Sequence, residues 1–351
     1  MTDSLAAAYP LLADQLPKVT LADLPTPVST VQFDTIVGPR TVSIKHDNVS
    51  NAQYGGNKIR KLEYIFQRAR ARGAERVATF GAVGSNHALA TAIFAKRSGL
   101  GCTCFLAHQK RTPNIPTTLN MHRKLGTEIV ALGSGVDRLA TLRHYLHGRR
   151  SWVIPLGGSS WLGATAFVNA GLELAGQIAT GDIARPDRIY IATGTMGSAA
   201  GLALGLALAE LPTELHAVRV VDQDYGSPSA FDRLMRKTAM MLNRLDSSIP
   251  ADLADRARVR WRDDYFAGGY AVFDEVISNA VALAADQLHL ALETTYTGKA
   301  MAALLGDLLS AHFAGENYLF WNTYNSRSLT VASERPRTPD NIPFDFMRYF
   351  D

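Results

Sequence analysis

The sequence predicts an α/β protein with open, twisted, mainly parallel sheets flanked by helices. Three observations support this fold class. Short apolar segments alternate with segments of helical periodicity along residues 77–155 and 188–221, which is typical of parallel strands joined by helical crossovers. Loops rich in glycine follow several of the predicted strands, as in sheets that bind ligands at the carboxyl ends of their strands. At 351 residues, 47% hydrophobic and 19% charged, the chain is long enough for two such domains.

The expected elements start with an extended segment, because the prolines of Leu24-Pro-Thr-Pro-Val28 disfavour helix at the residues before them. Two strands joined through Gly38-Pro39 follow, and a helix runs from Lys58 to about Arg72, where Gly73 ends it. The later strands are expected at 77–80, 102–107, 128–132, 152–155, 188–193, 216–221 and 318–321. The later helices are expected at 86–98, 113–125, 136–147, 163–180, 198–209, 229–244, 250–257, 273–287 and 297–314, with a surface-packed tail at 335–351.

Charge and cysteine content narrow the class of protein. The 36 basic and 32 acidic residues are nearly balanced and form no Lys/Arg run, which argues against nucleic acid as a partner. We find neither an apolar run of membrane length nor, in residues 1–18, the basic start of a signal peptide. A disulfide between Cys102 and Cys104 would be strained, and a metal would need further ligands nearby. We therefore expect free thiols, no metal and a cytoplasmic location.

A lysine lies in the first turn of the helix that follows Tyr54-Gly-Gly-Asn57. Leu62, Ile65, Phe66 and Ala69 fall on one face of this helix, and Arg60, Lys61, Glu63, Gln67 and Arg68 fall on the other, polar face. The helix dipole and the neighbouring cations disfavour a charged amine on Lys58. A neutral amine attacks carbonyl groups. The alternative is a solvated lysine on a basic helix.

Two further loops connect a strand to a helix and carry small polar residues. In Gly81–His87, Ser85 and Asn86 can cap the helix or leave its first N–H groups for an anion. In Pro155–Gly163, Ser159 and Ser160 can bond a carboxylate or cap the next helix. Each loop alone is compatible with a purely structural role.

The segment Thr193–Gly201 has the features of a phosphate site. Gly194 and Gly197 permit a tight turn with exposed amides in front of a helix N-terminus. Glycines at 197, 201 and 205 leave one helix face bare, and we expect that face to pack on the sheet. Asp222, after the next strand, keeps a nicotinamide cofactor open as an alternative. A reactive lysine together with a separate phosphate site indicates pyridoxal 5'-phosphate (PLP).

These segments together resemble one known family. Gly55-Gly-Asn-Lys58-Ile-Arg-Lys-Leu-Glu63 is similar to the lysine motif of the D-cysteine desulfhydrase and 1-aminocyclopropane-1-carboxylate (ACC) deaminase family, which are fold-type-II PLP enzymes related to the tryptophan synthase β subunit. The other segments that match in order and spacing are 24–27, 85–87, 155–163, 193–201 and 296–301. The resemblance, over about residues 20–330, implies a larger domain of residues 1–55 plus 165–351, a smaller domain of 56–164, and an active site in the cleft between them.

The resemblance also implies a role for each matching residue. Lys58 would bind the cofactor covalently and shuttle protons, with Ser85 and Tyr296 as the other catalytic residues. Asn86 would bond the ring hydroxyl of the cofactor, and Thr323 its ring nitrogen. The residues expected around the phosphate are Thr193, Gly194, Thr195, Met196 and Gly197. The residues expected to contact the substrate are Ser85, Asn86, His87, Ser159, Tyr296 and Tyr324.

Two departures from the family pattern bear on the substrate. The family usually has His-Thr-Gly-Gly after its last strand, whereas this chain has Asn322-Thr-Tyr-Asn325. Thr323 keeps a neutral hydroxyl, but Tyr324 adds bulk where the family has glycine. Thr297 stands where the deaminase branch has a glutamate, and Gly157-Gly-Ser-Ser160 is more similar to the desulfhydrase branch.

A neutral partner of the pyridine nitrogen stabilises a carbanion less than an acid does, which favours elimination. We therefore predict β-elimination on a small, D-cysteine-like amino acid, giving a 2-oxo acid, ammonia and a leaving group such as sulfide. The alternatives are an ACC deaminase or β-replacement enzyme of the same fold, a nicotinamide-dependent oxidoreductase, and a cofactor-binding relative without turnover. The resemblance further implies a homodimer.

Overall fold

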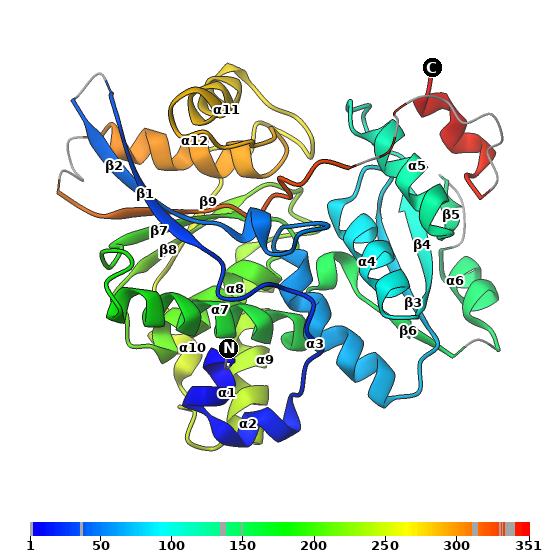
Figure 1. The fold of residues 1–351 in the computed structure, drawn as a ribbon, viewed down its shortest axis with the longest axis horizontal. Coiled ribbons are helices and arrows are strands. Elements are labelled where there is room, and N and C mark those ends of the chain that lie inside the picture. Colours follow the sequence, from blue (N-terminus) through cyan, green and yellow to red (C-terminus); the bar gives the residue numbers. More distant parts are fainter. Residues whose placement is uncertain are drawn as a thin grey trace. The chain divides into compact units, whose positions relative to one another are not determined.

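The computed structural model describes residues 3–35, 38–133, 138–148, 150–310, 315–329, 331, 333 and 341–351 (Figure 1). Parts of three predicted segments, at 136–137, 311–314 and 335–340, lie outside the described residues. The chain divides into two compact units. Unit 1 comprises residues 1–17, 22–61 and 159–326, and unit 2 comprises 18–21, 62–158 and 327–351.

Unit 1 contains a six-stranded sheet with the order β1-β2-β10-β7-β8-β9. Its strands are β1 (Val28–Phe33), β2 (Arg40–Lys45), β7 (Arg188–Thr193), β8 (Glu214–Arg219), β9 (Val259–Arg262) and β10 (Tyr318–Trp321). Only β1 and β2 pair antiparallel, as the short connection between them requires. The other neighbours are parallel, with Phe320 of β10 opposite both Ile44 and Tyr190. The predicted mainly parallel α/β architecture is confirmed.

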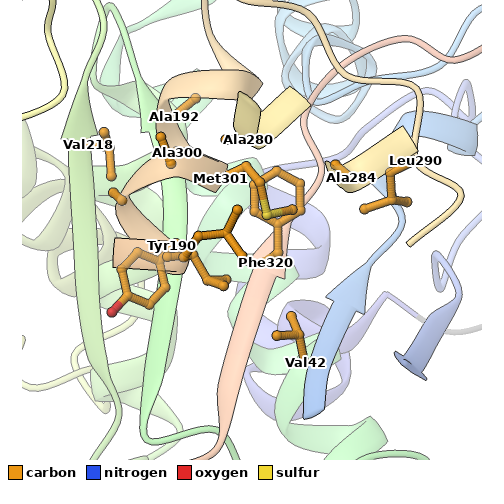
Figure 2. Packing of buried hydrophobic residues seen from close by; sticks show 14 of the residues in the cluster. Val42, Tyr190, Ala192, Val218, Ala280, Ala284, Leu290, Ala300, Met301 and Phe320 are labelled. Carbon is orange, nitrogen blue, oxygen red and sulfur yellow. The ribbon is translucent and has the colours of Figure 1, made fainter. Parts of the chain in front are cut away.

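Helices cover both faces of this sheet. The helices of unit 1 are α1 (Ser4–Ala8), α2 (Pro10–Gln15), α7 (Trp161–Ala179), α8 (Gly197–Leu208), α9 (Pro228–Leu245), α10 (Leu253–Arg256), α11 (Glu275–Gln287) and α12 (Thr297–Leu308). In Figure 1 the sheet lies between the α11–α12 pair and the α7–α8 pair. Figure 2 shows the core on the α11–α12 side, where Met301 of α12 packs against Phe320 of β10, with Tyr190 of β7 in the same cluster.

The glycine face of α8 packs on a helix, so the expectation that it packs on the sheet was wrong. A Cβ at Gly201 would lie 2.0 Å from the carbonyl oxygen of Ala164, and one at Gly205 would lie 2.5 Å from that of Val168. Both carbonyl oxygens belong to α7. The bare face therefore brings the backbones of α7 and α8 together, which places the start of α8 close to residues 159–160, just before α7.

Unit 2 contains a four-stranded parallel sheet with the order β5-β4-β3-β6. Its strands are β3 (Arg76–Ala82), β4 (Gly101–Ala107), β5 (Glu128–Leu132) and β6 (Ser151–Val153). Its helices are α4 (Asn86–Arg97), α5 (Ile115–Leu125), α6 (Arg138–Leu146) and most of α3 (Lys58–Ala71), together with a 3-10 helix at Phe344–Tyr349. The Tyr349 hydroxyl accepts from the Gln109 N–H at 3.1 Å and donates to the Gln109 carbonyl at 3.0 Å, which ties the tail to the end of β4.

The elements that the sequence did not predict are short or of mixed polarity. β9 alternates charged and apolar residues at the edge of its sheet, and α1 and α2 each span fewer than seven residues. None of the helices in the described part of the chain is long and apolar enough to cross a membrane.

Candidate functional site

Lys58 is the first residue of α3, and Asn57 connects it to the start of α8. The Asn57 side chain accepts from the Lys58 amine at 3.0 Å and donates to the Ser198 hydroxyl at 3.0 Å. Burial lowers the pKa of the Lys58 amine to about 8. The pKa is lowered, as predicted, but its cause is burial and not the helix dipole and neighbouring cations on which the prediction rested. A large share of this amine is therefore neutral near pH 8.

The polar face expected of the first turns of α3 is buried. Arg60 and Lys61 are 1% and 2% exposed. Arg60 forms ion pairs with Asp47 and with Glu173 of α7, both at 2.8 Å. A polar helix face is usually solvated, but here ionic partners far along the chain compensate the buried guanidinium. The start of α3 is thereby fixed from two sides.

The glycines before Lys58 allow the backbone to pass close to two other loops. A Cβ at Gly55 would lie 1.8 Å from the Asn48 carbonyl oxygen. Gly56 has a φ of +97°, and a Cβ there would lie 2.9 Å from the Thr323 carbonyl oxygen. The Asn325 side chain accepts from the Gly55 N–H at 2.6 Å. The segment after β10 is thus bonded to the loop that carries Lys58.

The segment between β7 and α8 forms a tight turn, as predicted. Met196, the N-cap residue of α8, takes a left-handed φ of 67°, and its own side chain makes no capping hydrogen bond. The Gly197 N–H donates to the Ser159 hydroxyl at 3.2 Å, and the Ser159 and Thr195 hydroxyl oxygens lie 2.7 Å apart. A helix N-terminus whose N-cap residue offers no side-chain acceptor, with two hydroxyls beside it, suits a phosphate group.

A second lysine amine lies at the same turn. A Cβ at Gly197 would lie 3.0 Å from the Lys61 amine, which is 3.4 Å from the Ser159 hydroxyl. Burial and the nearby Lys58 lower the pKa of Lys61 well below its ordinary value, and a phosphate dianion there would favour its charged form. Lys61 was not predicted as a site residue, although its spacing of three from Lys58 is a usable signal.

Two tyrosines meet at the start of α12. The hydroxyl oxygens of Tyr296 and Tyr270 lie 2.8 Å apart, and burial raises the pKa of both. The Tyr296 ring lies against Gly194, whose Cβ would be 3.5 Å from the ring. The backbone N–H groups of Tyr296 and Thr297 donate to the Glu293 carboxylate at 3.0 and 2.8 Å. Tyr270 was not predicted, because no motif surrounds it in the sequence.

The second group of predicted residues lies in unit 2, at the start of α4. Ser85 is the N-cap and accepts from the Ala88 N–H at 3.2 Å. The His87 Nε2 atom lies 2.9 Å from the Thr79 hydroxyl, which donates to the Ile154 carbonyl at 3.2 Å. The ring of His87 is therefore buried and bonded within unit 2. Asn86, the first residue of α4, is half-buried.

Within unit 1 the structure thus brings together the predicted residues Lys58, Ser159, Tyr296, Thr323 and the turn 193–197. Tyr324 belongs to the same segment as Thr323, and burial raises the pKa of its hydroxyl. Ser85, Asn86 and His87 belong to unit 2 and are described there by themselves.

Comparison with known proteins identifies the class. The family model described as "Pyridoxal-phosphate dependent enzyme" matches residues 19–323. The chain belongs to this family, its fold is that of the PLP enzymes of fold type II, and PLP is its cofactor. This assignment does not favour the nicotinamide alternative.

The relatives match this chain over most of their own length, and two of them carry the same name. A D-cysteine desulfhydrase of Salmonella choleraesuis (strain SC-B67) is 34% identical over 85% of this chain and 90% of its own length. One of Klebsiella pneumoniae subsp. pneumoniae is 33% identical over 90% of this chain and 96% of its own. A solved ACC deaminase homologue is 28% identical with a TM-score of 0.72, covering 92% of this chain and 95% of its own. These comparisons confirm the predicted resemblance.

Proposed function

We propose that this protein is a PLP-dependent lyase that eliminates the β-substituent of a small amino acid, with D-cysteine as the leading substrate. One observation carries the proposal: the desolvated amine of Lys58 is joined through Asn57 to the start of α8, next to a turn suited to phosphate. The names of the relatives support the choice of substrate. The overall reaction takes D-cysteine and water to a 2-oxo acid, ammonia and sulfide.

The residues of unit 1 fit the cofactor. Lys58 would bind its aldehyde, and the amides of residues 193–197, with the Ser159 hydroxyl and the Lys61 ammonium, would hold its phosphate. The Thr323 hydroxyl would bond the ring nitrogen. We assign Asn86 to the ring hydroxyl on the resemblance alone. When bound, PLP supplies an electron-withdrawing system that acidifies the α-proton of the substrate.

The substrate would be held by small polar groups. The first N–H groups of α4, at Asn86 and His87, are suited to a carboxylate, and the Ser85 hydroxyl lies at the same terminus. Because the buried ring of His87 bonds the Thr79 hydroxyl through Nε2, we assign its backbone rather than its ring to the carboxylate. Tyr324 would limit the size of the substrate side chain.

We assign proton transfer to Lys58 and to the hydroxyls of Tyr296 and Tyr270. The Lys58 amine, with a pKa of about 8, can take the α-proton and return it. The Tyr296 hydroxyl, bonded to that of Tyr270 at 2.8 Å, would donate toward the departing sulfur or the lysine. Their raised pKa values keep both hydroxyls protonated, so they act as donors. Ser85 would assist in these proton transfers.

Elimination is favoured over deamination of a cyclopropane by the neutral groups at the site. Thr323 carries no charge, and Thr297, at the position of the deaminase glutamate, bonds Glu293 at 3.1 Å through its hydroxyl. The ACC deaminase homologue of similar structure makes ACC the second substrate to test.

The test uses the purified protein. It should be yellow, and borohydride should fix the cofactor to the peptide that contains Lys58. Sulfide and 2-oxo acid should form from D-cysteine faster than from L-cysteine, and no 2-oxo acid should form from ACC. A Lys58→Ala protein that keeps full turnover, or a wild type inactive with all three compounds, would overturn the proposal.

We further propose a cytoplasmic homodimer. Cys102 and Cys104 are buried free thiols with sulfur atoms 3.7 Å apart, which suits a reducing compartment. The dimer rests on the family resemblance. Light scattering coupled to gel filtration should give twice the chain mass, and cell fractionation should find the protein with cytoplasmic markers.

A further inference from the structure

The loop that carries Tyr270 has an unfavourable backbone conformation. It joins β9 to α11, and three of its residues have left-handed φ values: Ala267 at 57°, Gly268 at 82° and Ala271 at 57°. Alanine rarely adopts this region, because its Cβ approaches the following carbonyl oxygen. Such a conformation persists only where surrounding contacts impose it.

Lys299, in the first turn of α12, supplies those contacts. Its side chain is fully buried, and its amine donates to the Phe266 carbonyl at 2.6 Å and to the Gly269 carbonyl at 3.1 Å. The same amine lies 5.0 Å from the centre of the Phe266 ring. An ammonium can satisfy both carbonyls at once, which a neutral aliphatic side chain cannot.

The loop meets α12 at two more points on the same face. A Cβ at Gly306 would lie 2.1 Å from the Tyr265 hydroxyl, so the tyrosine packs where the helix is bare. At the other end, the Tyr270 hydroxyl meets that of Tyr296, which precedes the helix. Lys299 and Gly306 lie on one face of α12, and Lys299 lies between Gly306 and Tyr296 along the chain.

We propose that Lys299 is a positioning residue for the reaction, holding the 263–272 loop so that the Tyr270 hydroxyl bonds that of Tyr296. This rests on the proposed function, in which that pair donates a proton. Lys299 touches neither cofactor nor substrate in this scheme. It acts by satisfying two carbonyls of a strained loop, and its effect passes through Tyr270.

The experiment compares holoenzymes of the wild type, Lys299→Met, Tyr270→Phe and the double variant. Lys299→Met should lower kcat about tenfold or more and leave KM for D-cysteine within about threefold. Because both changes disrupt the Tyr270–Tyr296 pair, kcat of the double variant should lie close to that of Tyr270→Phe alone.

Amide hydrogen exchange in residues 263–272 should accelerate in Lys299→Met and stay unchanged in Tyr270→Phe. Lys237→Met, on an exposed part of α9, is the control for loss of a lysine.

Two results would overturn the proposal: independent, multiplicative losses of kcat in the double variant, or unchanged exchange in the loop of Lys299→Met. If Lys299→Met does not fold, Lys299→Gln, whose shorter, uncharged side chain keeps an amide NH2 group, replaces it under the same criteria. If the wild type eliminates nothing from D-cysteine, the proposed function fails. The exchange measurement then still decides whether Lys299 holds the loop.

Discussion

Arg60 donates to both carboxylate oxygens of Glu173, at 2.9 and 2.8 Å, in the interior of unit 1. Lys45 donates to the same carboxylate at 2.6 Å, and the Arg60 guanidinium also pairs with Asp47. Each buried charge therefore has a partner of opposite sign. Because Arg60 follows Lys58 by two residues, the cluster holds the first turn of the helix on which the reactive amine lies.

Replacing Glu173 by glutamine should destabilise the protein strongly. The change leaves two buried cations with one fewer anion, and breaking a buried pair in this way costs about 3 kcal/mol or more in the free energy of unfolding. Urea denaturation followed by circular dichroism measures it. Asp232→Asn, which removes an exposed pair with Arg236, is the control and should have no measurable effect. Equal effects from both variants would contradict the role of burial.

The same cluster predicts an acid limit of stability. Burial alone would raise the pKa of Glu173, but Arg60 and Lys45 outweigh burial and lower it from 4.5 to about 2. A lowered pKa in the folded state means that the contribution to stability is complete above pH 4.5 and is lost as the pH falls toward about 2. Denaturation curves across this window should show wild-type stability falling more steeply than that of Glu173→Gln. Parallel curves would refute the assignment.

The sequence was sufficient for features with local signals. Lys58 at a helix start, the turn at 193–197 and most strands follow from periodicity and glycine placement, and the structure agrees. Features that depend on distant partners could not be predicted. Arg60 can be buried because it pairs with Glu173, and that partner lies 113 positions later in the chain. Likewise, Tyr270 belongs to the site only through its hydrogen bond to Tyr296, which is 26 positions away. No residue beside Tyr270 in the sequence indicates that contact.

Replacing Lys61 by methionine should weaken cofactor binding. The Lys61 amine lies at the turn 193–197, and a charge-assisted hydrogen bond to a phosphate contributes about 2 kcal/mol, or roughly thirtyfold in affinity. Absorbance titration of the cofactor-free protein with PLP gives the dissociation constant. Lys237→Met should bind as the wild type does. If Lys61→Met retains wild-type affinity, the phosphate is held without this cation.

Replacing Gly201 by alanine should destabilise the α7–α8 pair. The new Cβ would lie 2.0 Å from the Ala164 carbonyl oxygen, and backbone at this distance must move, at a cost of about 3 kcal/mol. The movement should also shift the start of α8 and weaken PLP binding. Gly176→Ala is the matched control, because it lies in α7 with nothing within 4 Å of the added Cβ. There alanine should stabilise the helix by up to about 1 kcal/mol. Thermal and urea unfolding should therefore change in opposite directions for the two variants, and a shift in the same direction would show that α7 and α8 do not need the bare face.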